Sequence, residues 1–512
     1  MGVLFYIGLA VLLLVTLGIG YILYGELIGY LRIVAYRKKG YKNIKYKFVL
    51  QRMKKERELY KSDDYYSNFK EWQINSDSKE PFFIVGGSFG CTLIPCSVEA
   101  ISEFYKHELK LTKKVNYFET LRFLAFFFEH GEKARKGRAT FAKIFHYSNV
   151  MKLMPQMILL VKKHVQNLKK RVEESKEKRL KVDLKKELLL EMFEDLTGCI
   201  LLTGADKKIR AKFEGMTISG ILKKMFDLYD ATARNPLSYL PFSEQLGFVK
   251  EANEFRRLQN GFRKIIADTY KERYNSATEE NLVDTSMIDI MVKLNKTVER
   301  DTGKPQFTME EISDNFEIFQ FAGSDTSFQG SCSFITFLAL PENQVHQEKL
   351  SNELKTELKD VQDLDNDTLN SLEMLDMGFR ETMRMANPAS EIIERIATKD
   401  CKICGCDIKK GDWIVNVLLQ FQPEYFLEPY KFIPQRFEKE ARKKIPLMKQ
   451  LPFSHGQRGC IGKYLGEMMV KLIVVELIQN FKFEVEEGYK MKLGFNPIYG
   501  VANPDLILSL RE

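Results

Sequence analysis

The stretch FSHGQRGCIG, residues 453–462, places one cysteine in a glycine-rich loop that leads into an apolar helical pattern. Gly456 and Gly459 allow backbone turns that side chains forbid, and they can bring backbone N–H groups close to the sulfur of Cys460. These donors and the cation of Arg458 would stabilise a thiolate, which is a good metal ligand. A buried structural cysteine is the alternative, and the combination of glycines, arginine and helix start argues against it.

A second segment, residues 308–340, predicts one long helix, which would measure roughly 50 Å at the usual rise per residue. It starts with a Thr-x-x-Glu capping box and ends before a proline. In its middle, the small residues Ala322 and Gly323 would let a ligand approach closely. Thr326 can bond back to the carbonyl group of Ala322, and its hydroxyl group could carry protons together with the Asp325 carboxylate. An ordinary packed glycine beside a polar helix face is the alternative.

Both segments resemble motifs of the cytochrome P-450 (haem-thiolate monooxygenase) family, of the membrane-anchored microsomal type. Residues 453–462 match the signature Phe-x-x-Gly-x-Arg-x-Cys-x-Gly position by position, and residues 322–326 match Ala-Gly-x-x-Thr in its Asp-Thr form. The resemblance implies that Cys460 is the axial ligand of a haem iron. It also implies that Phe453 packs beside the proximal face of the haem and that Arg458 approaches a propionate.

The same resemblance gives roles to the neighbouring motif residues. Gly456 belongs to the turn of the loop, and Gly462 removes a side chain where the following helix would press against a flat ligand. The Ala-Gly pair of the long helix would lie against the cofactor. Asp325 and Thr326 would steer protons to oxygen bound at the iron.

Further arginines fit the family pattern for haem propionates. Arg395 precedes Ile-Ala-Thr-Lys-Asp as in family members, where this arginine binds a propionate. Residues 130–138 look like the family helix that usually reads Trp-x-x-x-Arg, in which Arg138 matches and Ala134 replaces the tryptophan. One propionate contact is therefore missing, and Arg135 could compensate for it or could face solvent.

Three residues resemble a structural network of the family. Glu381 and Arg384 stand three positions apart on a predicted helix, where they can pair, and Arg436 lies in a Pro-Gln-Arg-Phe segment. The resemblance implies that these three side chains form a buried network behind the haem loop. We assign them to folding and haem retention, with no chemical step.

An apolar segment, residues 3–24, predicts an N-terminal transmembrane helix. Its 22 uncharged residues would span about 33 Å, close to the thickness of the hydrocarbon core of a bilayer. A cleaved signal peptide is the alternative, but the segment lacks a basic start and an Ala-x-Ala-like cleavage site. Basic residues on its C-terminal side place the following domain in the cytosol, so we expect a single-pass protein of the endoplasmic reticulum membrane.

The formal net charge of +9 is confined to one region, because residues 32–61 contain twelve Lys/Arg and two Glu. No interleaved basic and aromatic pattern indicates nucleic acid as a partner. The lysines would face membrane lipid or act only as a stop-transfer flank. We expect an anchor at 1–25, a basic juxtamembrane linker at 26–61 and a single haem-binding catalytic domain at 62–512. Residues 25–80 contain no proline, whereas microsomal family members usually have a proline-rich hinge there.

The remaining pattern is mainly helical, with short strand signals at 82–86, 413–419 and 481–485. The expected fold class is therefore mainly α with small β-sheets (α+β), and the resemblance implies the cytochrome P-450 fold. The eight cysteines are irregularly spaced, which indicates reduced thiols. Three of them, in Cys401-x-x-Cys404-Gly-Cys406, could suggest a zinc or iron–sulfur site, but a hairpin with its turn at Gly405 fits the segment better.

The resemblance implies a monooxygenase that inserts one oxygen atom of O2 into a small apolar substrate, such as a lipid, sterol, fatty acid or xenobiotic. Its cofactor would be haem b. Electrons would come from NADPH through a flavoprotein reductase, with cytochrome b5 as a second candidate partner. Haem-thiolate rearrangement of a peroxide is one alternative, although it needs no proton relay. A non-enzymatic haem sensor or lipid-binding protein is another.

Overall fold

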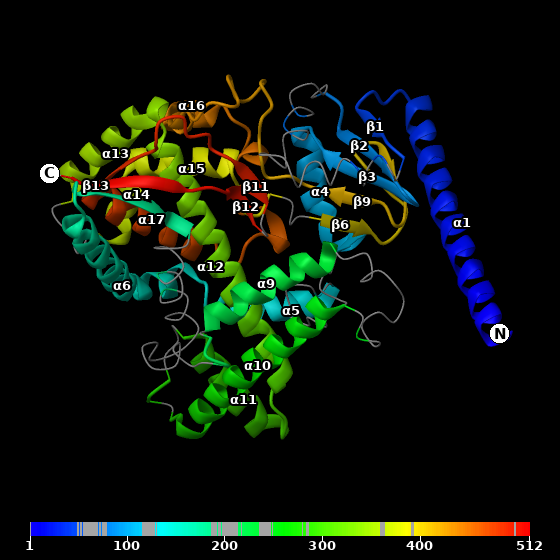
Figure 1. Cartoon of the computed structure of the whole chain (residues 1–512), viewed down its shortest axis with the longest axis horizontal. Coiled ribbons are helices and arrows are strands. Elements are labelled where there is room, and N and C mark those ends of the chain that lie inside the picture. Colours follow the sequence, from blue (N-terminus) through cyan, green and yellow to red (C-terminus); the bar gives the residue numbers. More distant parts are fainter. Residues whose placement is uncertain are drawn as a thin grey trace. The chain divides into compact units, whose positions relative to one another are not determined.

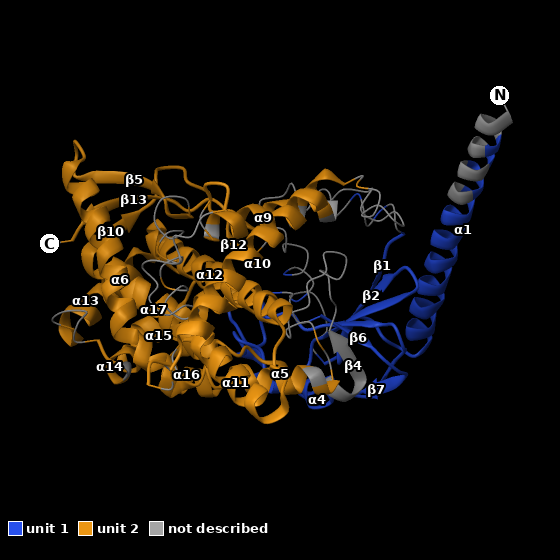
Figure 2. Ribbon diagram, turned by 90° about the horizontal axis from the view of Figure 1, so that it is seen from below, with its two compact units in different colours: residues 1–115, 390–429, 445–457 blue, residues 116–389, 430–444, 458–512 orange. Residues whose placement is uncertain are grey.

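Helices make up most of the described chain, and short strands form small sheets, as the sequence predicts (Figure 1). The computed structural model describes residues 2–48, 79–114, 131–185, 218–234, 249–278, 280–282, 286–358, 364–390, 394–495 and 498–511, together with residues 51, 54, 70, 73, 129, 192, 196, 213–216 and 247. The chain groups into two units (Figure 2). Unit 1 comprises Met1–Val115, Ser390–Pro429 and Ile445–Gln457, and unit 2 comprises Asn116–Ala389, Tyr430–Lys444 and Arg458–Glu512.

Unit 1 is built on a six-stranded sheet. Its strands, in spatial order, are β1 (Ile44–Tyr46), β2 (Phe82–Gly87), β3 (Gly90–Pro95), β9 (Trp413–Val415), β6 (Glu394–Ala397) and β4 (Thr112–Lys114). In β2, burial alternates along the strand, so one face of the sheet forms a core. Helix α4 (Val98–Leu111) follows β3. A separate hairpin joins β7 (Cys401–Ile403) to β8 (Cys406–Ile408), and its Gly405 has φ +73°, which confirms the predicted turn.

Helix α1 (Gly2–Lys38) also belongs to unit 1. Its C-terminal half packs on β1, β2 and β3, and its N-terminal half continues past the sheet (Figure 2). Within α1, residues Thr16–Lys38 meet the length and hydropathy expected of a membrane span. The apolar segment 3–24 predicted from the sequence is helical throughout, and the helix continues without a break through residues 26–38.

The predicted strand at 413–419 is shorter in the structure. Strand β9 ends at Val415, and the following residues are buried but leave the sheet. Their polar groups have other partners, since Asn416 Nδ2 donates to the Tyr105 hydroxyl group at 2.7 Å and the Leu418 N–H donates to Ser390 O at 3.1 Å. The other two strand predictions correspond to β2 and to β10 (Phe481–Glu484).

Unit 2 is largely helical. Its described helices of more than ten residues are α5 (Gly131–Ala142), α6 (Tyr147–Glu174), α9 (Ile218–Arg234), α10 (Lys250–Ser276), α11 (Met287–Thr302), α12 (Met309–Ala339), α13 (Gln344–Glu357), α15 (Glu373–Met385) and α17 (Lys463–Asn480). The long helix predicted at 308–340 is therefore confirmed. Its capping box forms as expected, with Glu311 N–H bonded to Thr308 Oγ1 at 3.2 Å and Thr308 N–H bonded to the Glu311 carboxylate at 2.9 Å.

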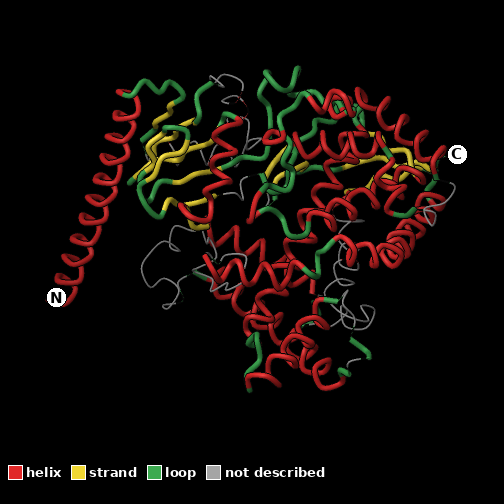
Figure 3. Tube along the Cα trace, turned by 180° about the vertical axis from the view of Figure 1, so that it is seen from behind, coloured by secondary structure: helices red, strands yellow, loops and turns green. Residues whose placement is uncertain are grey.

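Small sheets complete unit 2, and Figure 3 shows their strands in yellow together with the strands of unit 1. Strands β10, β13 (Asp505–Leu510) and β5 (Arg179–Asp183) form one sheet, and β11 (Leu493–Phe495) pairs with β12 (Tyr499–Val501). Helices α12 and α17 pack on each other in the core of unit 2, and both are buried along most of their length.

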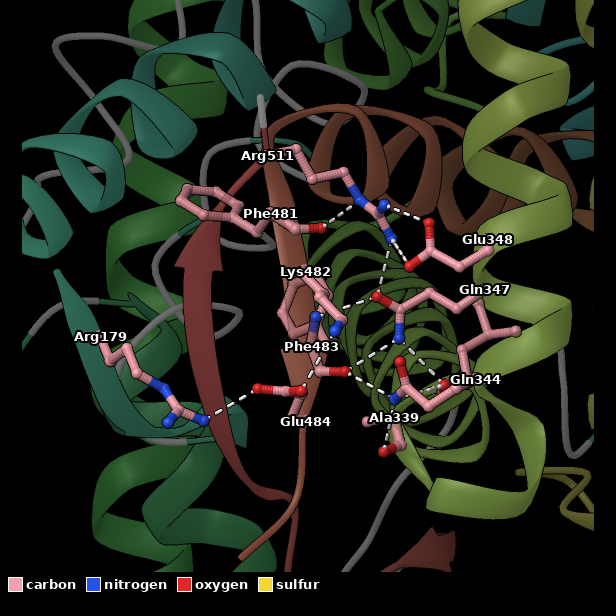
Figure 4. Close-up of polar contacts among 11 residues, drawn as sticks. Arg179, Ala339, Gln344, Gln347, Glu348, Phe481, Lys482, Phe483, Glu484 and Arg511 are labelled. Atoms are coloured by element: carbon pink, nitrogen blue, oxygen red, sulfur yellow. Dashed lines mark hydrogen bonds and ion pairs between the residues drawn. The ribbon is translucent and has the colours of Figure 1, made fainter.

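The fully buried Gln347 of α13 ties this helix to β10 (Figure 4). Its Nε2 donates to Phe483 O at 2.9 Å, and its Oε1 accepts from Phe483 N–H at 3.0 Å. Arg511 donates to the same Oε1 at 2.9 Å and pairs with Glu348 at 2.8 Å. A buried side-chain amide thus replaces a sheet neighbour for β10, which keeps its backbone groups hydrogen-bonded.

Candidate functional site

Cys460 belongs to unit 2, and it is exposed although protein atoms surround much of its thiol. Burial raises the pKa of its thiol, yet the residue is exposed, so protein atoms do not fill the space beside it. The same thiol accepts from the backbone N–H of Gly462, and Arg138 and Lys463 are close enough to lower its pKa against the effect of burial. The loop thus offers a partly stabilised sulfur to an incoming group, and α17 begins directly after it, at Lys463.

Two predicted arginines of unit 2 hold the backbone around this cysteine. Arg138, on α5, donates to Gly459 O at 2.7 Å, directly beside Cys460. Arg458 donates to Glu129 O at 3.0 Å. A guanidinium group carries five N–H donors, so one arginine can in general bind a carbonyl oxygen and an anion together.

The other two residues of the α5 motif lie in different environments. Ala134 is buried, whereas Arg135 is exposed (69% for its side chain) and pairs with Glu132 at 2.6 Å. Of the two alternatives for Arg135, the structure shows the solvent-facing one. The assignment of Arg135 to a haem propionate stays a prediction.

The first part of the cysteine loop, residues 453–457, belongs to unit 1 and is held by α4. Phe453 is half-buried there. Ser454 and Gly456 both have left-handed backbone conformations, with φ +62° and +72°, which bend the loop sharply. The Tyr105 hydroxyl group lies 3.0 Å from Ser454 Oγ and accepts from Asn416. Tyr105 is a positioning residue that no local sequence signal could reveal, because Ser454 is 349 positions away.

Arg395, also in unit 1, is buried on β6. Its Nε donates to Glu108 Oε1 at 2.6 Å, so a carboxylate of α4 already neutralises this cation. Glu108 is fully enclosed and was not expected from the sequence. The assignment of Arg395 to a haem propionate stays a prediction, and Glu108 would then share the guanidinium group with the propionate.

The middle of α12 is more open than the segments on either side of it. Residues 321–326 are half-buried, whereas the flanking stretches 312–318 and 327–339 are buried. Thr326 Oγ1 donates to Ala322 O at 2.6 Å, as expected, and Ser324 makes the equivalent bond to Gln320 O. These bonds draw helix carbonyl groups toward side chains, which bends helices.

Asp325 has a shifted acidity in this open segment. Burial raises the pKa of its carboxyl group to about 6, and Asp227 adds to the increase. Lys185 and Lys223 act in the opposite direction. The side chain can therefore exist in either protonation state near neutral pH, which suits a group that passes protons.

The three predicted network residues do meet in unit 2. Arg384 donates to the Glu381 carboxylate through two nitrogens, at 2.7 and 2.9 Å, and Arg436 donates to the same carboxylate at 3.2 Å. The backbone N–H of Ile433 supplies a fourth bond at 2.8 Å. All three side chains are buried or nearly so, and their complete set of bonds indicates a structural role.

The chemistry of this donor set limits what can bind. A single thiol cannot fill the coordination sphere of a metal ion, so a metal at Cys460 would have to arrive within a cofactor that supplies the other ligands. Haem is such a cofactor. The exposed sulfur and the arginine of α5 that braces its loop fit a haem with an axial thiolate.

A protein family matches this chain over most of its length, and individual relatives match about half of it. The family model described as Cytochrome P450 matches residues 78–508. The chain is 32% identical over 259 residues to cytochrome P450 3A18 of Rattus norvegicus, which is 50% of each chain. It is also 32% identical over 238 residues to cytochrome P450 3A7 of Homo sapiens, which is 46% of each chain. The matched region thus spans about half the length of these curated relatives.

Solved structures with low sequence identity share the fold. A cyanobacterial protein with bound retinoic acid matches with a TM-score of 0.68 at 18% identity, covering 87% of this chain and 94% of that one. The haem domain of a mutant protein described as cytochrome P450DA matches with a TM-score of 0.70 at 16% identity, covering 87% and 93%. These matches confirm the expected fold.

Proposed function

Because the chain belongs to the cytochrome P450 family, we propose that it is a monooxygenase that inserts one oxygen atom of O2 into an apolar organic substrate. The family uses haem b, O2 and electrons derived from NADPH. The observation that carries the proposal is the exposed sulfur of Cys460 in a loop braced from α5. We assign Cys460 as the axial ligand of the haem iron.

The residues around the sulfur would prepare it for this role. Burial raises the pKa of the Cys460 thiol, and the backbone N–H of Gly462 with the cations of Arg138 and Lys463 partly opposes this by stabilising the thiolate. A thiolate on haem iron pushes electron density toward bound oxygen and favours cleavage of the O–O bond. The bond from Arg138 to Gly459 O fixes the backbone next to the ligand, which keeps the sulfur in one position.

Proton supply is assigned to the open segment of α12. Asp325 can hold a proton on its carboxyl group near neutral pH, because burial raises its pKa to about 6. Thr326 donates its hydroxyl hydrogen to Ala322 O, so its oxygen can still accept a hydrogen bond. Ala322 and Gly323 present little side-chain bulk, which would let the flat cofactor lie against the helix.

The remaining haem contacts are proposed from the family resemblance. Phe453 would pack beside the proximal face, the turn at Gly456 would shape the loop, and Arg458 and Arg395 would bind propionates. Glu381, Arg384 and Arg436 would stabilise the fold around the cofactor without taking part in the reaction, as their mutual bonds support.

The membrane and electron partners follow from α1 and from the relatives. A long apolar helix near the N-terminus supports a single-pass anchor in the endoplasmic reticulum membrane, with the catalytic part in the cytosol. We propose an NADPH-dependent flavoprotein reductase as the electron donor and cytochrome b5 as a second donor. The substrate would be a lipid, sterol, fatty acid or xenobiotic.

A spectroscopic experiment tests the central assignment. The purified protein should contain haem b, and its reduced carbon monoxide complex should show the strongly red-shifted Soret band that thiolate ligation produces. Cys460→Ser should abolish this band. Cys401→Ser, which changes a partly exposed cysteine of the β7–β8 hairpin, should retain it. A protein that binds no haem, or a Cys460→Ser variant that keeps the band, would contradict the proposal.

A further inference from the structure

A buried ammonium group lies in unit 1, just before the cysteine loop. Lys449 is 3% exposed and is the last residue of the short helix η6 (Leu447–Lys449). Its Nζ donates to Cys96 O at 2.5 Å and to Gln422 Oε1. The same nitrogen lies over the ring of Tyr425, 5.4 Å from the ring centroid. A buried cation is thus bonded to neutral oxygen atoms and packed against an aromatic ring.

Burial makes this cation costly to hold without its bonds. It lowers the pKa of Lys449 to about 8, and the influence of Cys96, Glu424 and Glu99 opposes the shift only in part. A buried charged group that loses its hydrogen bonds is left without solvation, at a greater cost than a neutral group. The two bonds of Lys449 therefore hold its segment of the chain firmly.

The two oxygen atoms that bind Lys449 come from two different segments of unit 1. Cys96 follows strand β3 and precedes helix α4. Gln422 ends the buried segment 416–422, which continues from β9. In the sequence these two partners lie 353 and 27 positions from Lys449. One side chain thus joins the start of α4, the segment after β9 and the chain that enters the cysteine loop.

A second set of contacts, at Tyr105, joins the same three segments. The Tyr105 hydroxyl group lies 3.0 Å from Ser454 Oγ in the cysteine loop and accepts from Asn416 Nδ2 at 2.7 Å. Tyr105 belongs to α4, and Asn416 belongs to the buried segment after β9. Between the two anchors, the Ser454 N–H donates to Leu451 O at 3.1 Å, which keeps this stretch compact. Residues 449–454 are therefore held at both ends by the same two supports.

The sharp bends of the loop begin where these anchors end. Ser454 and Gly456 have left-handed φ values of +62° and +72°. A Cβ atom on Gly456 would lie 3.8 Å from a ring atom and from the backbone oxygen of Tyr105, so the turn packs against α4. Only a few residues separate these bends from Cys460. A displacement of residues 449–454 would therefore reach the sulfur.

We propose that Lys449 is a positioning residue for the proposed haem ligand. Its ammonium group, together with the Tyr105 hydroxyl group, fixes the chain that enters the cysteine loop, which keeps the Cys460 sulfur in the place that ligation requires. The inference rests on the proposed ligation by Cys460, and it adds a residue that lies outside the loop motif. Lys449 acts through the backbone and needs no contact with the cofactor.

The lifetime of the thiolate-ligated state tests this role. The full-length protein, purified with haem, is reduced under carbon monoxide, and the loss of its red-shifted Soret band is followed over time. Lys449→Met keeps most of the apolar side chain but removes the charge and its donors. We expect the band to disappear about tenfold faster than in the parent, because the sulfur leaves its position more often. Haem content per protein should stay close to that of the parent.

A change at Gln422 should have the opposite effect. Gln422→Glu places a carboxylate at the oxygen position that Lys449 already bonds, so the neutral contact becomes a charge-assisted one. The band should then persist about twofold longer than in the parent. This variant leaves Lys449 in place and decides the question if Lys449→Met yields no folded protein. A lifetime equal to or shorter than that of the parent would then overturn the proposal.

The second anchor provides a further variant. Tyr105→Phe removes one oxygen atom and leaves the ring packed in place, so the fold should persist. It breaks the contacts with Ser454 and Asn416, and the band should disappear about threefold faster than in the parent. An unchanged lifetime would show that Tyr105 has no part in holding the loop.

Two controls separate positioning from stability. Lys410→Met removes an exposed lysine of unit 1 and should leave the lifetime of the band unchanged. Ile84→Ala removes apolar volume from a fully buried site on β2, so it should lower the urea midpoint at least as much as Lys449→Met. Measured without urea, its band should persist as long as that of the parent, because the loop keeps both anchors.

The outcomes distinguish this inference from the proposed function. A parent protein without haem, or without the red-shifted band, would overturn both. A parent with the band, and unchanged lifetimes in Lys449→Met and Gln422→Glu, would overturn the role of Lys449 alone. Equal shortening of the lifetime in Ile84→Ala and Lys449→Met would show that Lys449 only stabilises the fold.

Discussion

Asp325 is the side chain whose surroundings bear most directly on the proposed chemistry. Its pKa of about 6 is set mainly by burial within unit 2, and Asp227, Lys185 and Lys223 modify it. The carboxyl group is protonated below this value and ionised above it. Its capacity to donate a proton therefore falls as the pH rises through about 6.

The pH dependence of coupling should reveal this titration. With a reductase and an accepted substrate, the yield of product per NADPH consumed should fall as the pH rises from about 5.5 to about 8 in the parent protein. In Asp325→Asn the yield should be several-fold lower and nearly independent of pH, because the amide does not titrate. Asp227→Asn is the control, since it removes only a neighbouring charge and should shift the profile toward lower pH. An unchanged profile in Asp325→Asn would refute the assignment.

The cysteine loop shows which single-residue roles can be predicted from sequence. Its glycines, its arginine and its cysteine follow one another directly, so their spacing alone indicates the chemistry. Arg395 also has a recognisable local context, but its partner Glu108 is 287 positions away. Arg395 and Glu108 come together only when the chain folds, so no local sequence pattern predicts their pairing.

At the scale of elements, the connection between α13 and β10 depends on one buried amide. Gln347 bonds both backbone groups of Phe483 and accepts from Arg511 (Figure 4). Replacing it with leucine would leave buried donors without partners, each of which costs about 1–3 kcal/mol.

We expect Gln347→Leu to lower the free energy of unfolding by about 2–4 kcal/mol, measured by urea denaturation in detergent. Asn352→Leu, on the exposed side of the same helix, should change it by less than about 0.5 kcal/mol. Equal effects of the two substitutions would show that the buried amide does not hold β10 in place.

The predictability of elements also varied for physical reasons. The boundaries of α12 were predictable because its capping box and the following proline are local signals. The basic composition of residues 26–61 indicates a juxtamembrane linker, and the structure adds that α1 continues through the first part of this segment, to Lys38. Arg37 and Lys38 are exposed and Arg32 is half-buried, whereas the buried positions Gly29 and Ile33 fit a partner surface that the sequence does not reveal.

At the scale of the whole molecule, stability should depend on pH through Glu317. This residue of α12 is buried, and burial, with the nearby Asp314, raises the pKa of its carboxyl group well above the ordinary value. Arg263 and a hydrogen bond from Gln259 only partly oppose the shift. The folded state thus retains a proton that the unfolded chain releases above about pH 4.3.

The free energy of unfolding should therefore fall as the pH rises from about 4.3 to the raised pKa of Glu317, by at most about 1.4 kcal/mol per pH unit. Glu317→Gln removes the titration, so its urea midpoint relative to the parent should be higher at about pH 8 than at about pH 5. Glu357→Gln, an exposed site on α13, should show no such difference. If the difference in urea midpoint between Glu317→Gln and the parent is the same at both pH values, Glu317 does not retain the expected proton in the folded state.

The packing of α1 on the strands β1, β2 and β3 has a mechanical consequence. When an apolar helix is longer than the surrounding hydrocarbon layer, it tilts to reduce the mismatch. A helix with a flexible joint would tilt alone, but the segment from Gly25 to Lys39 is bonded to the β2–β3 hairpin at one end and to the β7–β8 hairpin at the other. A thinner membrane would therefore rotate unit 1 together with the helix, so that bilayer thickness would set the angle at which this part of the protein faces the lipid.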